Sequence, residues 1–233
     1  MSSRTALLLG GTGLVGRNCL SFLLEDDFYQ RVVVLGRRPL DVSHSKLEHH
    51  IVDFERLETY SDLLNVDDIF CCLGSTIRKA GSQSLFSRID FTYPYLIAKL
   101  ALRQGASQFF IISSVGASHQ SNNFYLGVKG QIENALMIMS YRAVHIFRPS
   151  LIGGKRGEFR FGERIAQEIL SCFAFLLVGQ LRKFKPIDAQ VLSQAMIEAA
   201  REDLSGVHIH EYDKIIQLAN RSRPLKFDRS GLS

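Results

Sequence analysis

The sequence predicts an α/β fold: a doubly wound, mostly parallel sheet with helices on both faces. Strand-like and helix-like segments alternate along the chain without a long break, which is the pattern of a parallel sheet covered by helices. The first strand-like run, residues 4–9, is apolar and ends abruptly in glycines, as strands of such sheets do where a helix follows. With 233 residues, 46% of them hydrophobic, the chain can bury one sizeable core. We expect a single domain over residues 1–219, with a small substrate-side region at about 150–219.

The expected elements follow from the spacing of apolar residues. The expected strands are 4–9, 31–35, 50–53, 68–73, 108–112, 141–147 and 206–210. The expected helices are 14–24, 54–64, 84–104, 129–139, 164–178, 188–200 and 212–218. Pro94 either kinks the long helix at 84–104 or marks its true start. Residues 220–233 are polar and rich in arginine and serine, and we expect a disordered tail there.

Composition limits the partners and the compartment. The net charge is +5, but the basic residues are scattered, which favours an anionic small molecule over nucleic acid. No run of 18 apolar residues predicts a membrane span, and the four cysteines lack the spacing of a zinc site, so no metal is expected. The first strand begins too close to Met1 for a secretory signal, so we expect a cytoplasmic protein.

Three glycines follow the first strand at a spacing typical of a phosphate-binding loop. Gly10, Gly13 and Gly16 permit a tight turn, a close approach of backbone N–H groups to a pyrophosphate, and close packing of the next helix on the strand. The positive end of that helix points at the phosphates. The alternative is an ordinary tight turn between a strand and a helix.

The end of the second strand indicates the cofactor. An acidic residue there holds the ribose hydroxyl of NAD, whereas arginine accommodates the 2′-phosphate of NADP. The chain has Arg37 and Arg38 at this position and no acid, which favours NADP(H) unless both are solvated loop arginines. Asp53, after the third strand, either accepts from the adenine amino group or caps the following helix.

A second group of residues carries acid–base chemistry. Tyr125 and Lys129 are four apart, so on a helix they share a face. We expect the lysine ammonium to lower the pKa of the phenol from about 10, so that the tyrosine can exchange a proton near neutral pH. Ser113 and Ser114 end the fifth strand, at the edge where ligands of open sheets bind, and a hydroxyl there can orient a carbonyl.

Together these motifs resemble the short-chain dehydrogenase/reductases of the extended or atypical type. The match covers most of residues 4–152 and is carried by Gly10-Gly11-Thr12-Gly13-Leu14-Val15-Gly16, Asp53-Phe54, Ser113-Ser114 and Tyr125-x-x-x-Lys129. More narrowly, the chain is similar to the Tat-interacting-protein oxidoreductase group in Gly36-Arg37-Arg38, Val52-Asp53-Phe54, Cys71-Cys72-Leu73-Gly74, Lys79-Ala80-Gly81, Asn123-Phe124-Tyr125-Leu126, Val128-Lys129-Gly130 and Phe147-Arg148-Pro149.

The resemblance implies an NADPH-binding Rossmann protein. It makes Tyr125 the acid and base, Lys129 its partner and Ser114 the hydroxyl that orients the carbonyl. The candidate cofactor-binding residues are Gly10, Thr12, Gly13, Leu14, Val15, Gly16, Arg37, Arg38, Asp53, Phe54, Leu73, Gly74, Ser75, Lys129 and Pro149.

Two residues depart from the family pattern. Ser114 precedes Tyr125 by eleven residues, slightly fewer than is typical, so Ser113 is the alternative residue facing the substrate. Asp90 stands on the expected long helix where many members carry an asparagine, so the usual four-residue proton relay is not expected in its ordinary form.

Two functions follow. The first is an NADPH-dependent oxidoreductase that transfers hydride to the carbonyl of a small, apolar substrate. The second is an NADPH-sensing regulatory protein read by a protein partner, with little or no turnover. An epimerase or dehydratase with tightly held NAD is disfavoured by Arg37 and Arg38. The apolar segment 169–178 is expected either to pack on the sheet or a dimer partner, or to form a wall of the substrate pocket; the protein is expected to be a monomer or a homodimer.

Overall fold

The central sheet has seven strands, all of them parallel to their neighbours. The computed structural model describes residues 4–154, 179–202 and 204–221. The strand order is β3-β2-β1-β4-β5-β6-β9, and each adjacent pair is parallel. The strands are β1 (Arg4–Leu9), β2 (Tyr29–Gly36), β3 (Leu47–Ile51), β4 (Asp68–Cys71), β5 (Gln108–Ile112), β6 (Ala143–Phe147) and β9 (Gly206–His210). The predicted α/β class with a parallel sheet is confirmed.

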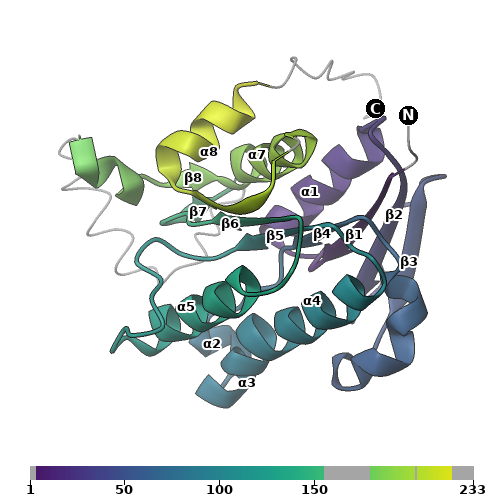
Figure 1. The fold of residues 1–233 in the computed structure, drawn as a ribbon, viewed down its shortest axis with the longest axis horizontal. Coiled ribbons are helices and arrows are strands. Elements are labelled where there is room, and N and C mark those ends of the chain that lie inside the picture. The colour runs from purple at the N-terminus through teal and green to yellow at the C-terminus, as the bar shows by residue number, and fades with distance from the viewer. Residues whose placement is uncertain (1–3, 155–178, 203, 222–233) are drawn as a thin grey trace.

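Helices cover both faces of the sheet (Figure 1). One face carries α1 (Leu14–Glu25), α7 (Ala189–Arg201) and α8 (Tyr212–Ala219), and the other carries α4 (Tyr93–Arg103) and α5 (Phe124–Met137). Two hydrophobic clusters, one on each side, separate the sheet from these layers. Successive side chains of β1 point to opposite faces of the sheet and so enter different clusters. Ala6 and Leu8 belong to the cluster under α1, whereas Leu7 and Leu9 belong to the other cluster.

The strand order reverses between β1 and β4. The chain builds outward from β1 through β2 to β3, then crosses back to place β4 on the other side of β1. In open parallel sheets, such a reversal leaves a crevice at the carboxyl ends of the two strands, where ligands bind. The glycine loop follows β1, so it lies at this crevice.

The helices differ from the prediction in three places, in their bounds or in their type. The long helix expected at 84–104 is divided into α3 (Gln83–Ser87), a π-helical turn η2 (Arg88–Thr92) and α4, with Pro94 in the first turn of α4. Pro94 therefore marks the start of a helix, where its missing N–H costs nothing. The segment η1 (Phe54–Leu64) is a 3₁₀ helix interrupted at Arg56 and Tyr60. Finally, α5 begins five residues before the predicted Lys129, because the side chain of Asn123 caps its first turn.

Short elements that the sequence analysis did not predict complete the described fold. They are α2 (Ile77–Ala80), η3 (Gly179–Phe184) and a separate parallel pair, β7 (Ile152–Gly153) and β8 (Ile187–Asp188). The predicted helix at 164–178 lies outside the described residues, as do residues 222–233 of the tail expected at 220–233. Asn220, the first residue of that tail, is the C-cap of α8. Cys19, Cys71 and Cys72 are buried free thiols.

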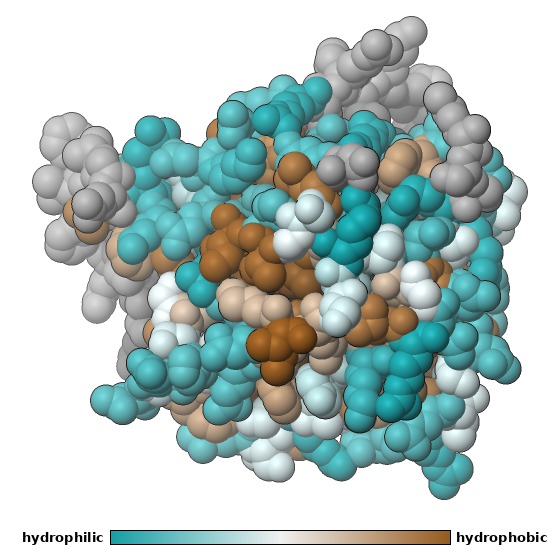
Figure 2. Space-filling view, viewed as in Figure 1, coloured by the Kyte–Doolittle hydropathy of each residue, from teal (hydrophilic) through white to brown (hydrophobic). Residues whose placement is uncertain are grey.

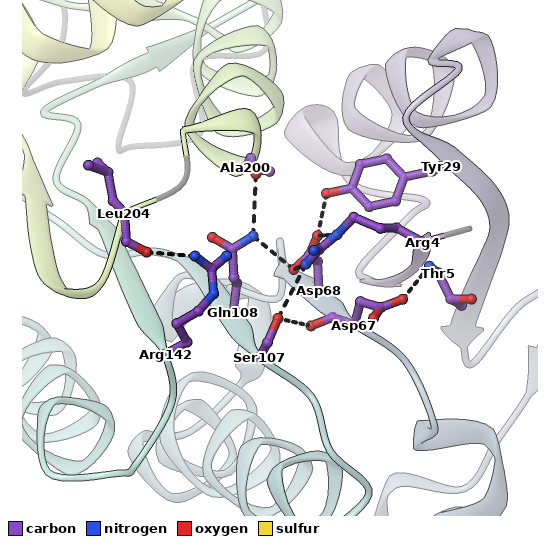
Figure 3. A network of polar contacts seen from close by, with 10 residues as sticks. All are labelled: Arg4, Thr5, Tyr29, Asp67, Asp68, Ser107, Gln108, Arg142, Ala200 and Leu204. Carbon is purple, nitrogen blue, oxygen red and sulfur yellow. Dashed lines mark hydrogen bonds and ion pairs between the residues drawn. The ribbon is translucent and has the colours of Figure 1, made fainter. Parts of the chain in front are cut away.

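A polar network joins the amino ends of the strands, opposite the ligand edge (Figure 3). Asp68, at the start of β4, is fully buried and accepts hydrogen bonds from Arg4 (Nε, 3.0 Å), Tyr29 (Oη, 2.7 Å) and Gln108 (Nε2, 3.0 Å). Gln108 also donates to the backbone carbonyl of Ala200 in α7 at 3.3 Å. The network therefore connects four strands and one helix at the end of the sheet opposite the crevice.

The surface seen in Figure 2 is mostly polar around one central hydrophobic patch. Large hydrophobic side chains are also exposed on the edge strand β9, where Val207 is 42% and Ile209 43% exposed. No helix in the described ranges is long and apolar enough to cross a membrane.

Candidate active site

The glycine loop brings backbone against backbone. Gly10 has a φ of 79°, and a Cβ on it would lie 2.6 Å from the carbonyl oxygen of Cys72. A Cβ on Gly16 would lie 2.1 Å from the carbonyl oxygen of Gly10. Only glycine fits at these two positions, so α1 begins directly against the loop. The N-cap residue of α1 is Gly13, which provides no side chain to bond the first N–H groups.

A first cavity extends from this loop toward the end of β2, with a volume of about 440 Å³. Its lining includes Gly10, Thr12, Arg37, Arg38, Phe54 and Leu73 from the predicted cofactor set. The guanidinium of Arg38 lies 3.5 Å from the hydroxyl of Thr12. In the described part of the chain, neither Arg37 nor Arg38 pairs with a carboxylate, and both are exposed. Two cations at this edge with no carboxylate partner among the described residues suit an anionic group such as a phosphate.

Two residues of this region, Asp53 and His49, take positions that the sequence had not determined. Asp53 caps η1, accepting from the backbone N–H of Glu55 at 3.0 Å, and it does not line the cavity. The structure thus shows the capping alternative. His49 of β3 lines the cavity, although no sequence pattern predicted it there. Burial lowers the pKa of its imidazole, with a further lowering from His50.

A second cavity, of about 640 Å³, opens beside the first, and Leu73 lines both. It lies at the carboxyl ends of β4, β5 and β6. The predicted site residues in its lining are Val15, Leu73, Gly74, Ser75, Ser113, Tyr125, Lys129 and Pro149. Its wall also includes the apolar side chains of Ile112 and Ile152, and the exposed Lys79. Most residues that the sequence proposed for cofactor and chemistry are therefore brought together along one groove.

The position of α5 places Tyr125 and Lys129 at this cavity. A Cβ on Gly130 would lie 2.1 Å from the backbone nitrogen of His119, so the glycine lets the helix lie against the loop after β5. The aromatic ring of Tyr125 packs on Phe86 of α3, with 5.5 Å between ring centroids. Lys129 is only 4% exposed and donates to the backbone carbonyl of Ile112 at 3.0 Å. Both side chains are thus held by buried contacts rather than left free.

The two serines after β5 make different contacts. Ser114 is hydrogen-bonded to the Tyr125 phenol, and its hydroxyl lies 3.3 Å from the carbonyl oxygen of Val115. Ser113 lines the cavity, is 4% exposed, and within the described residues its hydroxyl has no hydrogen-bond partner. Ser114 therefore contacts the phenol, while Ser113 offers an unused hydroxyl to the same cavity.

Asp90 is the charged neighbour of this group. Its Oδ1 lies 2.7 Å from the ammonium of Lys129, and its Oδ2 accepts from the backbone N–H of Ser75 at 2.9 Å. Burial alone would lower the pKa of Lys129, but the Asp90 carboxylate and the Tyr125 phenol raise it above its ordinary value. The sequence showed that Asp90 departs from the family pattern, but not that it pairs with Lys129.

The expected lowering of the tyrosine pKa is wrong as a net effect. Burial raises the pKa of the Tyr125 phenol and the Asp90 carboxylate adds to this rise. The Lys129 ammonium and the Ser114 hydroxyl both lower it, as expected, but they do not outweigh the other two. The sequence could predict the lysine but not the desolvation, because burial depends on how α3 and η2 pack over α5.

These features fit a dinucleotide. Side chains at Gly10 and Gly16 would occupy the space that the glycine loop leaves open, and the cations near Thr12 suit a phosphate. The two cavities, which share Leu73 in their linings, match the two halves of such a molecule. In the ranges that the structure describes, His, Cys, Asp and Glu side chains form no cluster of three that could hold a metal ion.

A parallel sheet with a glycine loop at its reversal point and a Tyr-Lys pair across the crevice defines a nicotinamide-dinucleotide-binding protein of the Rossmann type. A family model described as "NAD dependent epimerase/dehydratase family" matches residues 6–125. The chain therefore belongs to this family, and the resemblance inferred from the motifs is confirmed.

Sequence relatives narrow the resemblance. The chain is 34% identical over 172 residues to "Protein HTATIP2" of Rattus norvegicus, covering 72% of this chain and 71% of the relative. It is 30% identical over 207 residues to "Protein FMP52, mitochondrial" of Debaryomyces hansenii, covering 86% of this chain and 89% of the relative.

Solved structures share the fold at low identity. A UDP-N-acetylglucosamine 4-epimerase from Methanobrevibacter ruminantium superposes with a TM-score of 0.66 at 16% identity, covering 91% of this chain and 77% of that one. The Bordetella bronchiseptica enzyme WbmH, in complex with NAD⁺, has a TM-score of 0.65 at 13% identity, covering 89% and 75%.

The expected cytoplasmic location is contradicted by the relatives. Fungal relatives from Debaryomyces hansenii, Candida albicans and Candida glabrata are named as mitochondrial proteins. Buried reduced cysteines do not distinguish the cytoplasm from other reducing compartments.

Proposed function

We propose that this protein is an NADPH-dependent reductase that acts on the carbonyl group of a small, apolar molecule. One observation carries the proposal: the Tyr125 phenol, the Lys129 ammonium and the Ser113 hydroxyl line one cavity beside the glycine-loop crevice, and Ser114 contacts the phenol. A protein that only sensed the dinucleotide would need the crevice but not this group.

The dinucleotide, when bound, supplies the hydride. Tyr125 donates its phenolic proton to the carbonyl oxygen, acting as the general acid. Lys129 acts on the phenol through its ammonium and would hold the ribose when the cofactor is bound, and Ser114, bonded to the phenol, would orient the carbonyl. The raised pKa of Tyr125 keeps the phenol protonated at neutral pH, as a proton donor must be.

The cofactor preference rests on Arg37 and Arg38. Both line the first cavity without a carboxylate partner in the described residues, and a guanidinium can bind the 2′-phosphate of NADPH through two parallel hydrogen bonds. The structural neighbour named as an epimerase and the one solved with NAD⁺ share only the fold with this chain, so the NAD⁺ of the second does not transfer to it.

The substrate class follows from the walls of the second cavity. Val15, Leu73, Ile112 and Ile152 give it an apolar lining around the polar group at Tyr125. Such a pocket suits an apolar aldehyde or ketone whose single carbonyl reaches the phenol.

The names of the fungal relatives also lead us to propose a mitochondrial location.

A direct test has two parts. Nucleotide released from the purified protein is identified by mass, and NADPH and NADH affinities are compared by fluorescence titration. NADPH oxidation is then followed with a panel of apolar aldehydes and ketones. We expect tighter binding of NADPH and turnover with at least one carbonyl. Tight binding without turnover over the panel would replace the enzyme with an NADPH sensor, and absence of dinucleotide binding would contradict both functions.

A further inference from the structure

Asp90 is a buried carboxylate on a segment that is unusual for a helix. It is 2% exposed and lies in η2, the π-helical turn between α3 and α4. π-helical turns are rare and frequently mark functional sites. Here the turn directs an acid into the lining of the second cavity, next to the glycine at position 74, where a Cβ would lie 3.6 Å from Oδ1.

The two oxygens of Asp90 bind two different parts of the site. Oδ2 accepts from the backbone N–H of Ser75, in the loop that follows β4, at 2.9 Å. Oδ1 lies 2.7 Å from the Lys129 ammonium, which also donates to the carbonyl of Ile112 at 3.0 Å. The acid therefore fixes the lysine against the loop and leaves one ammonium hydrogen for another acceptor.

We propose that Asp90 is a positioning residue, which holds the Lys129 ammonium in place and offsets its charge so that the Tyr125 phenol keeps its proton at neutral pH. This role belongs to the proposed reductase reaction, and its kinetic test rests on that proposed function. An isolated buried ammonium would pull a proton from the phenol more strongly than one already paired with a carboxylate.

The other groups that face this pair do not replace Asp90. On β4, burial raises the pKa of the Cys71 thiol to about 12, and Cys72 likewise has a raised pKa, from its hydrogen bond to Cys19 and from burial, so both remain neutral. Ser113 and Ser114 after β5 carry no charge, and Lys79 of α2, at the exposed rim, is a cation. Asp90 is therefore the one acid among the residues described around this cavity.

Removal of the Asp90 charge should lower the pH at which the site loses its proton. In Asp90→Asn the amide oxygen can still accept from Ser75, but Lys129 and Tyr125 become a buried cation and a phenol without a counter-charge. The Lys129 ammonium then stabilises the phenolate without the opposing Asp90 carboxylate, so the phenol loses its proton at a lower pH. Reduction then declines at a lower pH, because the general acid is lost earlier.

The experiment titrates the phenol by NMR of protein labelled with ¹³C-tyrosine, with Tyr125 assigned from the Tyr125→Phe spectrum. We expect the midpoint to fall by about one to three pH units in Asp90→Asn, as for loss of an adjacent charge. The high-pH limit of carbonyl reduction should fall in parallel. Asp90→Glu keeps the charge and should restore the midpoint. The matched control is Asp213→Asn, because Asp213 forms an exposed ion pair with Arg182 at 3.0 Å; it should leave the titration unchanged.

Outcomes separate this inference from the proposed function. An unchanged midpoint in folded Asp90→Asn would overturn it and reduce Asp90 to a structural role. Should Asp90→Asn not fold, the wild-type titration decides: the inference requires a Tyr125 phenol that is protonated at neutral pH, and a midpoint at or below about pH 7 overturns it. A wild type that reduces no carbonyl defeats the proposed reductase, while the titration still tests Asp90.

Discussion

Arg37 and Arg38 are single residues whose place at the candidate cofactor site was predicted from the sequence. Their place after β2 was readable from the sequence, because the distance from the glycine loop to the end of the second strand varies little in this fold. The structure adds that both line the same cavity as Thr12. Their charges are therefore free to bind a phosphate.

The first prediction concerns these arginines. Arg37→Ala combined with Arg38→Ala should weaken NADPH binding by a few kcal/mol, since hydrogen bonds to charged groups contribute about 1.5–3 kcal/mol each. NADH binding should change little, because NADH lacks the 2′-phosphate. Fluorescence titration of both nucleotides measures the difference, and equal losses would rule out the assigned phosphate contact.

The second prediction separates the two serines. Ser114→Ala removes the hydroxyl bonded to the phenol and should lower kcat by about 10²-fold or more, as loss of one positioned donor does. Ser113→Ala should lower it far less. Steady-state kinetics on the same carbonyl compares the two variants, and the reverse ranking would assign the carbonyl contact to Ser113.

Other residues of the site could not be found from the sequence. Asp90 departed visibly from the family pattern, but its pairing with Lys129 depends on a π-helical turn that no periodicity predicts. His49 enters the first cavity because β3 pairs with the end of β2 in one register, and register is set by tertiary packing. The net direction of the Tyr125 pKa required knowledge of burial.

Among the elements, both strands and helices were predicted in part. The strands β1, β5 and β9 have their predicted bounds, whereas β3 begins three residues before the predicted position 50. The predicted helix at 84–104 is divided, because apolar spacing is nearly the same for α- and π-helical turns over so short a stretch. The pair β7 and β8 has only two residues in each strand, too few to produce a pattern.

The contact between β6 and β9 carries a testable pH dependence. Nδ1 of His145 lies 3.1 Å from Nε2 of His210, and the two rings stack in parallel, with 5.3 Å between their centroids. Burial lowers the pKa of His145 to about 3, with further lowering from His210 and other cations. Burial, with His208 and Lys214, lowers the pKa of His210 to about 4.

The third prediction follows from these pKa values. In the unfolded chain both histidines take up protons near pH 6.5, whereas in the fold they stay neutral to about pH 4 or below. The stability is therefore fully present above about pH 6.5 and falls as the pH drops toward 4, by the order of a few kcal/mol. Urea unfolding of the wild type and of the His145→Phe, His210→Phe double variant measures it. The double variant should lose less stability in acid; an unchanged acid slope would refute the assignment, and exposed His44→Asn serves as the control.

At the scale of the whole molecule, stability and binding lie at opposite edges of the sheet. The Asp68 network joins β1, β2, β4, β5 and α7 at the amino ends of the strands, whereas both cavities lie at the carboxyl ends (Figure 3). The sequence predicted the sheet, but not this network, because Arg4 and Asp68 are 64 positions apart and meet only through strand pairing.

The fourth prediction tests this division. Arg4→Met leaves the fully buried Asp68 carboxylate without its cation and should cost about 3–5 kcal/mol of unfolding free energy. Arg31→Met breaks an ion pair whose side chains are 41% and 39% exposed and should cost less than about 1 kcal/mol. Urea unfolding gives both values. NADPH affinity should be the same in the folded variants, and a large loss of affinity in Arg4→Met would contradict the separation of the two edges.

The most direct test of the proposed reductase is the Tyr125→Phe variant, measured for NADPH affinity and for the rate of carbonyl reduction in single turnover. The change keeps the ring against Phe86 and removes only the proton donor. We predict a loss of about 10²–10⁴ in the chemical step with almost unchanged affinity, whereas Lys129→Met should weaken both. Full reductase activity in Tyr125→Phe would contradict the account, because the proton would then come from another group.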